Sequence, residues 1–114
     1  MINVKYRDGS KNFKLFKGAE KIFYNLDNIA THKECIIVEG EFDVLSFATA
    51  GHLNCVSVPN GFNLKGDNVN LDYLDNYYNY FENKETIYIA VYNDAAGQKG
   101  QKELIRRFGA EKCK

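Results

Sequence analysis

The feature that most restricts the fold of this chain is an apolar run followed by polar, acidic and small residues, within residues 85–97. Residues 87–91, Ile-Tyr-Ile-Ala-Val, form a near-continuous apolar run, which is typical of parallel strands buried on both faces. Asn93 and Asp94 follow where this strand should end, and the next residues turn the chain into a helix. A carboxylate at the carboxyl end of a parallel strand lies where open α/β sheets bind their ligands.

A second segment of the chain repeats this plan. Residues 35–38 are an apolar strand, Glu39 and Gly40 end it, and residues 41–50 have helical character. This helix carries apolar residues on most of its sides, which predicts a crossover helix that the rest of the domain covers. If the two strands are neighbours, Glu39 and Asp94 face one crevice, and two acids there indicate a site for a divalent metal.

The rest of the pattern predicts an α/β domain with a parallel sheet. A third strand is expected at residues 54–58, an amphipathic helix at residues 68–82 and a last helix at about residues 96–108. Strands that alternate with helices imply right-handed crossover connections between parallel strands.

A β-hairpin is expected ahead of this core. Residues 2–16 alternate between apolar and polar side chains around an Asp-Gly-Ser turn. We therefore expect residues 1–32 to form a hairpin and connecting segment that pack on a core formed by residues 33–114. A chain of 114 residues is long enough for one domain with one hydrophobic core.

Charge and cysteine usage exclude several classes of protein. The 15 basic and 15 acidic residues cancel, so the chain is not a uniformly basic nucleic-acid clamp, and its basic ends are more often solvated faces. The 3 cysteines are an odd number and lie far apart, which argues against a disulfide framework or zinc ribbon and fits a reducing cytoplasm. No apolar run approaches about 18 residues and no signal-peptide pattern begins the chain, so we expect no membrane partner.

Three acidic residues are the candidates for chemistry, and each has a structural alternative to weigh. Asp43 falls in the first turn of its helix, where it either compensates the helix dipole or takes part in the site. Asp94 either binds a metal or caps the helix that begins near Ala96. Glu39 has no capping role in the predicted structure, and because an unpaired buried charge is costly, a cation is the expected partner.

These residues suggest phosphoryl-transfer chemistry with Mg²⁺ or Mn²⁺. Mg²⁺ binds through one or two carboxylates and completes its shell with water and substrate phosphates. Glu39 would act as general base or ligand, and Asp94 would act as a ligand, with Asp43 as a further candidate ligand. The candidates for binding nucleotide phosphates are Lys99, Asn60, Gly61 and Lys65.

Three motifs together resemble one known family. They are Val-Glu-Gly-Glu-Phe-Asp at 38–43, Val-Ser-Val-Pro-Asn-Gly at 56–61 and Ala-Val-Tyr-Asn-Asp-Ala-Ala-Gly at 90–97. The set is similar to the TOPRIM domain of phage-type primase-helicases and their Twinkle-like relatives. The resemblance implies a Rossmann-like, three-layer fold, with a mostly parallel sheet of about four strands flanked by helices and an N-terminal β-hairpin extension.

The same resemblance implies an activity. In that family the glutamate that matches Glu39 is the general base, and an Asp-x-Asp pair after the third core strand holds Mg²⁺. The implied function is synthesis of RNA primers from nucleoside triphosphates on single-stranded DNA template in DNA replication. This chain contains no P-loop motif and no paired-cysteine zinc module, so the zinc-binding and helicase domains are expected in cis or in trans.

One residue departs from the family pattern. Tyr92 stands where the family has the first aspartate of the Asp-x-Asp pair. A phenol with a pKa of about 10 is a poor ligand for a hard metal at neutral pH. This predicts weakened Mg²⁺ binding. Because the zinc-binding and helicase modules are not in this sequence, we also expect little primer synthesis by the isolated chain.

Other functions stay open at this point. The alternatives are a catalytically degenerate TOPRIM domain with a structural or nucleic-acid-binding role, and a nuclease-type or topoisomerase-type TOPRIM domain. A receiver-like regulatory domain also has acids at strand ends, but Glu39-Gly40-Glu41 fits its acidic pair poorly.

Overall fold

A three-stranded parallel sheet forms the centre of the domain. The computed structural model describes residues 5–7, 13–15, 23–59, 64–65, 68–69, 71 and 73–114. Strand β3 (Glu34–Val38) lies between β4 (Cys55–Ser57) and β7 (Thr86–Ala90), and it is parallel to both. Val38 pairs with Ser57 on one side and with Ala90 on the other. The three strands therefore end at the same edge of the sheet.

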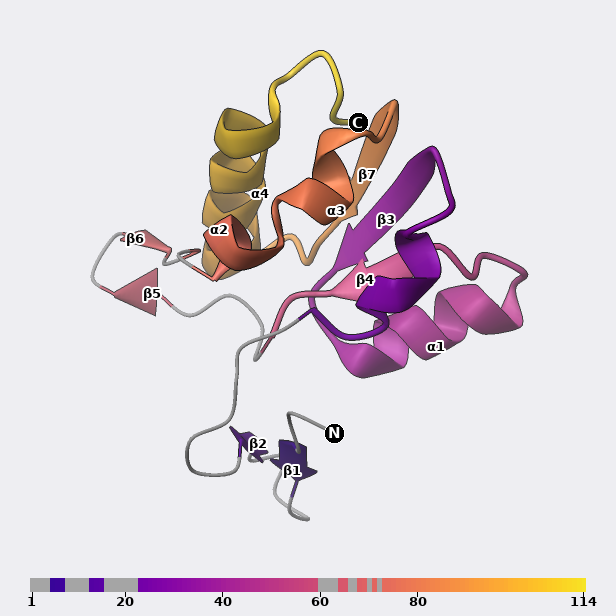
Figure 1. Ribbon diagram of the computed structural model, residues 1–114. Coiled ribbons are helices and arrows are strands. Elements are labelled where there is room, and N and C mark those ends of the chain that lie inside the picture. Colours follow the sequence, from indigo (N-terminus) through magenta and orange to yellow (C-terminus); the bar gives the residue numbers. More distant parts are fainter. Residues whose placement is uncertain are drawn as a thin grey trace.

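Helices cover both faces of this sheet, as the TOPRIM resemblance implies (Figure 1). Helix α1 (Glu41–Thr49) lies on one face, where Val44 packs with Ile36 and Val38 of β3. The other face is covered by α2 (Leu74–Tyr77), α3 (Asn79–Glu82) and α4 (Ala95–Phe108). The larger core forms on that face from residues such as Ile37, Val56, Leu74, Ile87 and Leu104, all fully buried.

The expectation of about four strands is corrected to three in the described part of the chain. Beside each edge strand, another segment pairs at a single residue only. Tyr24 bridges Ser57 in antiparallel orientation, and Cys113 bridges Ile87 in parallel orientation. The chain passes these positions without extending the ladder far enough to make a further strand.

The helix expected at residues 68–82 is wrong in its first half. Asn68–Val69 form strand β6, which pairs antiparallel with β5 (Leu64–Lys65), and helical structure begins only at Leu74. Asparagine is a poor helix former, and the stretch before Leu74 is rich in it. The apolar spacing predicted the burial of Leu74 and Phe81, which are fully buried, whereas Tyr78 in the same spacing is 36% exposed. Apolar spacing at three and four residues thus identified the core side chains but not the start of the helix.

Helix α1 is less covered than its composition predicted. Val44 is buried, but Phe42 is 63% exposed and Leu45 is 48% exposed. The helix packs on the sheet through one face, so apolar residues on its other sides face outward. Gly51, which follows the helix, has φ of 99°, a conformation that glycine adopts without strain. No helix in the described parts of the chain is long and apolar enough to cross a membrane.

The expected hairpin is present, and a short 3₁₀ helix follows it in the chain. Strands β1 (Lys5–Arg7) and β2 (Phe13–Leu15) pair antiparallel. The 3₁₀ helix η1 (Leu26–Ile29) places Leu26 and Ile29 in the larger core, together with Phe23. This segment therefore contributes apolar side chains to the same core as the sheet.

A buried lysine joins η1 to the segment before β7. The Lys84 ammonium donates hydrogen bonds to the carbonyl oxygens of Ile29, at 2.5 Å, and His32, at 2.6 Å. Its side chain is almost fully buried. We expect Lys84→Met to lower the free energy of unfolding by about 1–3 kcal/mol, because both carbonyl groups lose their donor.

Urea denaturation measures this effect, and Lys33→Met is the matched control. Lys33 is exposed and lies 3.6 Å from the Glu85 carboxylate, a surface pair whose loss changes stability by no more than about 0.5 kcal/mol. Equal effects of the two substitutions would contradict a stabilising role for the Lys84 hydrogen bonds.

Candidate functional site

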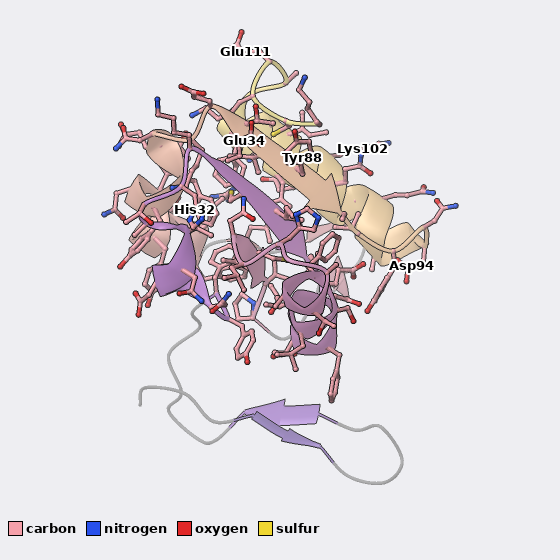
Figure 2. The ribbon with its side chains drawn as sticks, turned by 90° about the vertical axis from the view of Figure 1, so that its right-hand side faces the viewer. His32, Glu34, Tyr88, Asp94, Lys102 and Glu111 are labelled. Carbon is pink, nitrogen blue, oxygen red and sulfur yellow. The ribbon has the colours of Figure 1, made fainter. Side chains whose placement is uncertain are left out.

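The two strands that carry the predicted acids are neighbours. Strands β3 and β7 pair in parallel register from Glu34 opposite Thr86 to Val38 opposite Ala90. Glu39 follows directly after β3, and Asp94 follows β7 at the same edge of the sheet. In Figure 2 the β7 arrow runs from Tyr88 towards Asp94, which lies where the chain enters α4. The predicted neighbour relation is confirmed.

Glu39 finds its hydrogen-bond partner within the protein. The side chain is buried, and its Oε2 atom accepts a hydrogen bond from the backbone N–H of Tyr92 at 2.5 Å. Burial raises the pKa of Glu39, the Tyr92 N–H lowers it, and the nearby charges of Asp94 and Asp43 raise it further. The expectation that Glu39 needs a cation as its partner is thus corrected in part, because a backbone donor fills that role.

Asp43 connects three parts of the site. Its Oδ2 atom accepts hydrogen bonds from the Gly40 N–H at 3.2 Å and from the Tyr92 hydroxyl at 2.7 Å. The first bond satisfies a donor at the start of α1, a capping role in addition to the compensation of the helix dipole that the sequence suggested. The second bond ties α1 to the segment after β7.

Tyr92 lies among the three predicted acids. The pKa of its hydroxyl rises to about 12, first because of its hydrogen bond to Asp43, then because of partial burial and the charges of Asp43, Glu39 and Asp94. The charges of three carboxylates therefore raise the pKa of this one phenol. The hydroxyl is protonated at neutral pH and serves as a hydrogen-bond donor.

Asp94 is the N-cap of α4. Its backbone is extended, and its Oδ1 atom accepts a hydrogen bond from the Gly97 N–H at 2.7 Å. An aspartate in this position satisfies one of the unpaired donors of the first helical turn. The structural alternative for Asp94 is therefore realised, and it uses only one of the two carboxylate oxygens.

Gly97 is a site residue that the sequence reasoning missed. A Cβ atom at this position would lie 2.0 Å from the Tyr92 carbonyl oxygen and 3.0 Å from Asp94 Oδ1. Only glycine allows α4 to begin so close to the end of β7. The available signal was a glycine inside the first turn of a helix, three residues after its N-cap.

The candidate phosphate-binding residues are placed only in part. Lys99 is half-buried in α4, five residues after Asp94. Lys65 belongs to β5. Asn60 and Gly61 lie outside the described residues, so their predicted role stays a prediction.

The donor set fits a hard divalent cation in chemical type. Glu39 and Asp94 provide two carboxylates at one edge of the sheet, the number that Mg²⁺ uses when substrate phosphates and water complete its shell. Within the described ranges, no three Asp, Glu, His or Cys side chains are gathered as a ready-made metal site. The backbone N–H of Tyr92 donates to Glu39, and its hydroxyl donates to Asp43. The family pattern has a further carboxylate at the position of Tyr92. The residues present therefore fit a cation held by two carboxylates.

The raised pKa of Glu39 has a consequence for stability. Because the folded state holds this proton more tightly than the unfolded state, the stabilisation is fully present below the ordinary pKa of 4.5 and is lost as the pH rises through the raised value. Glu39→Gln keeps an acceptor for the Tyr92 N–H but carries no charge. We expect the variant to be more stable than the native chain at pH 7, by a margin that shrinks as the solution is acidified.

Thermal unfolding of both proteins between neutral and acidic pH measures this margin. Other titrating groups are common to the two proteins and cancel in the difference. A margin that stays constant across the pH range would show that Glu39 has an ordinary pKa.

Fold and site together define a class of protein, a three-layer α/β domain with carboxylates at adjoining carboxyl ends of parallel strands. The model of the Toprim-like family matches residues 36–114, and the chain belongs to this family.

Two curated relatives from Arabidopsis thaliana are each 37% identical to the chain over 122 aligned residues and cover 99% of it. They are a primase homolog protein, of which the match spans 36%, and a chloroplastic/mitochondrial Twinkle homolog protein, of which it spans 17%.

A solved structure has the same fold. The crystal structure of the primase fragment of the bacteriophage T7 primase-helicase protein is similar with a TM-score of 0.76 and 23% sequence identity, over 99% of this chain and 46% of that one. This chain is thus a TOPRIM domain of the primase and Twinkle-like kind, and it spans well under half the length of the relatives it matches.

Proposed function

We propose that this chain is the catalytic TOPRIM module of a primase-helicase-like protein, which makes RNA primers by Mg²⁺-dependent nucleotidyl transfer. The observation that carries the proposal is the placement of Glu39 and Asp94 after the paired parallel strands β3 and β7, with Tyr92 donating hydrogen bonds to Glu39 and Asp43. Open α/β sheets bind ligands at this edge, and carboxylates are the ligands that Mg²⁺ prefers. The primase and Twinkle homologs among its relatives also support a primase-type function.

In this proposal the three acids share two roles, acceptance of a proton and coordination of the metal. Glu39 accepts the proton of the attacking hydroxyl, a role that suits a buried carboxyl with a raised pKa. Asp94 would hold the metal through the oxygen that does not cap α4, with Glu39 as the second ligand and Asp43 as a further candidate. A bound Mg²⁺ supplies neutralisation of the charge that develops on the transferred phosphate. Lys99, Lys65 and the Asn60-Gly61 turn are the proposed phosphate contacts.

Tyr92 weakens this site in the proposal. It contributes a protonated phenol where the family pattern has a carboxylate, and it occupies one oxygen of Asp43. The second candidate function, a degenerate TOPRIM domain with a structural or nucleic-acid-binding role, rests on the same hydrogen bond. In both cases the single-stranded template and the nucleoside triphosphates would bind through the full-length protein, and the zinc-binding and helicase domains would act in cis or in trans. A cytoplasmic location stays a prediction.

Direct measurement of cation binding tests the proposal. We would titrate Mn²⁺ into the 114-residue chain and follow the free ion by electron paramagnetic resonance. Asp94→Asn preserves an N-cap and Glu39→Gln preserves the acceptor for Tyr92, so each removes a charge while keeping its structural bond. We expect measurable binding by the native chain and at least about tenfold weaker binding by either variant.

Each result of this titration bears on the proposal. Binding that neither substitution changes would place the cation elsewhere and refute the metal assignment. Absence of binding by the native chain would favour the degenerate TOPRIM domain instead.

A further inference from the structure

Tyr92 contacts the protein through its backbone and through its hydroxyl group. Its backbone N–H donates to Glu39 Oε2, its carbonyl oxygen lies against Gly97, and its hydroxyl donates to Asp43 Oδ2. These contacts come from the residue after β3, from α4 and from α1 in turn. Three separate segments of the fold therefore hold the backbone and the hydroxyl group of Tyr92.

The ring is nonetheless open to solvent. Tyr92 is 53% exposed, although its N–H, carbonyl and hydroxyl groups all contact the protein. The exposed area must therefore come mainly from the aromatic ring. A preorganised and exposed aromatic face binds a flat partner without the entropy loss of ordering a mobile side chain.

The charges around the ring restrict what such a partner can be. Glu39, Asp43 and Asp94 repel a phosphate group that arrives without a cation, but they do not oppose an uncharged heterocycle. Nucleobases stack on aromatic side chains irrespective of sequence, because every base has a π-face.

We propose that the Tyr92 ring is a stacking platform for a nucleobase at the carboxyl edge of the sheet. The inference rests on the proposed function, since it names the part of a nucleotide that this crevice contacts besides the phosphates. It also gives the departure from the family pattern a role, because an aspartate at this position offers no ring.

Two residues with amide side chains, Asn93 and Gln98, follow Tyr92 in the sequence. Gln98 Nε2 donates to Asn93 Oδ1 at 2.8 Å, and both residues are exposed. This bond uses one polar atom of each amide, which leaves the Asn93 Nδ2 donor and the Gln98 Oε1 acceptor for an external group. Such a donor and acceptor beside a stacked base are suited to contact its edge.

The test separates the contribution of the base from that of the phosphates. We would compare the affinity of the 114-residue chain for ATP and for inorganic tripolyphosphate, both with Mn²⁺, by isothermal titration calorimetry. Tripolyphosphate carries the phosphates without a base. We expect ATP to bind more tightly than tripolyphosphate, and Tyr92→Ala to remove that advantage, a loss of roughly 5- to 100-fold.

Two variants control for indirect effects of the substitution. Tyr92→Phe keeps the ring but loses the hydrogen bond to Asp43, and we expect it to retain the advantage of ATP. Tyr88→Ala removes another exposed tyrosine, which lies in β7 and is 40% exposed, and this variant should also retain the advantage (Figure 2). A Tyr92→Ala variant that keeps the advantage, or an equal loss in Tyr88→Ala, would overturn the proposal.

A second probe identifies the source of the base and works without a metal. A single-stranded oligonucleotide with one 2-aminopurine should lose fluorescence on the native chain and on Tyr92→Phe, but not on Tyr92→Ala, if the platform takes bases of a strand. Quenching confined to the nucleoside 2-aminopurine riboside, which carries no phosphate for the acids to repel, assigns the platform to a free nucleotide. If neither probe is quenched, the stacking role is refuted. If tripolyphosphate binds neither the native chain nor any variant, only the proposed metal site is refuted.

Discussion

Replacement of Gly97 by alanine is expected to destabilise the domain by about 3 kcal/mol. At an exposed helix position the same change would stabilise the protein by up to about 1 kcal/mol, because alanine is the better helix former. Here the new Cβ atom would lie 2.0 Å from the carbonyl oxygen of Tyr92. Both atoms belong to the backbone or lie next to it, so the start of α4 must move away from the end of β7.

Urea denaturation of the two proteins measures the change in the free energy of unfolding. Gly40→Ala is the matched control, since its Cβ would meet Asp43 Oδ2 at 3.4 Å, an ordinary contact. A cap residue changed from glycine to alanine costs only a modest amount of stability. A Gly97→Ala protein as stable as the native chain would show that α4 can begin elsewhere without loss.

The second large effect is expected in cation binding. Tyr92→Asp should tighten binding of Mg²⁺ or Mn²⁺ by about tenfold or more, because it replaces a neutral phenol by a carboxylate beside Asp94. It also releases Asp43 Oδ2 from its hydrogen bond to the tyrosine hydroxyl. The same electron paramagnetic resonance titration with Mn²⁺ measures the change.

Tyr92→Phe separates the two contributions. It releases Asp43 without adding a charge, so we expect only a small gain in affinity. Equal and tight binding by the native chain and Tyr92→Asp would show that the tyrosine does not limit the site. In the absence of a metal, Tyr92→Asp should be less stable than the native chain, because a fourth carboxylate joins three that already repel one another.

Local pattern was sufficient to place β3, β7 and the carboxyl edge of the sheet. Apolar runs predicted both strands, and the polar residues after them predicted where each strand ends. The burial on both faces expected for residues 87–91 is wrong, because β7 is an edge strand and Tyr88 is 40% exposed. The N-cap role of Asp94 was also visible as an alternative, because capping depends on residues within one helical turn. The helix at residues 68–82 was predicted less well, since pairing of β6 with β5 overrode a helical spacing.

The contacts of the site could not be read in the same way. Tyr92 is 53 positions from Glu39 and 49 from Asp43, yet it donates a hydrogen bond to each. Such contacts depend on which strands are neighbours and how their ends align, which no local pattern encodes. The expectation of a cation beside Glu39 arose from its predicted burial, and the backbone N–H that donates to it belongs to the segment after β7.

The amino-acid sequence alone determined the α/β class, the family resemblance, the identity of the three acids and the presence of tyrosine in place of an aspartate. These follow from composition and spacing within short segments, where residue type and periodicity carry the information. The tertiary structure alone decided that the tyrosine bonds to two of those acids and that α4 begins against its carbonyl oxygen. Such relations arise only when the parallel strands are brought side by side, because they join residues that lie far apart along the chain.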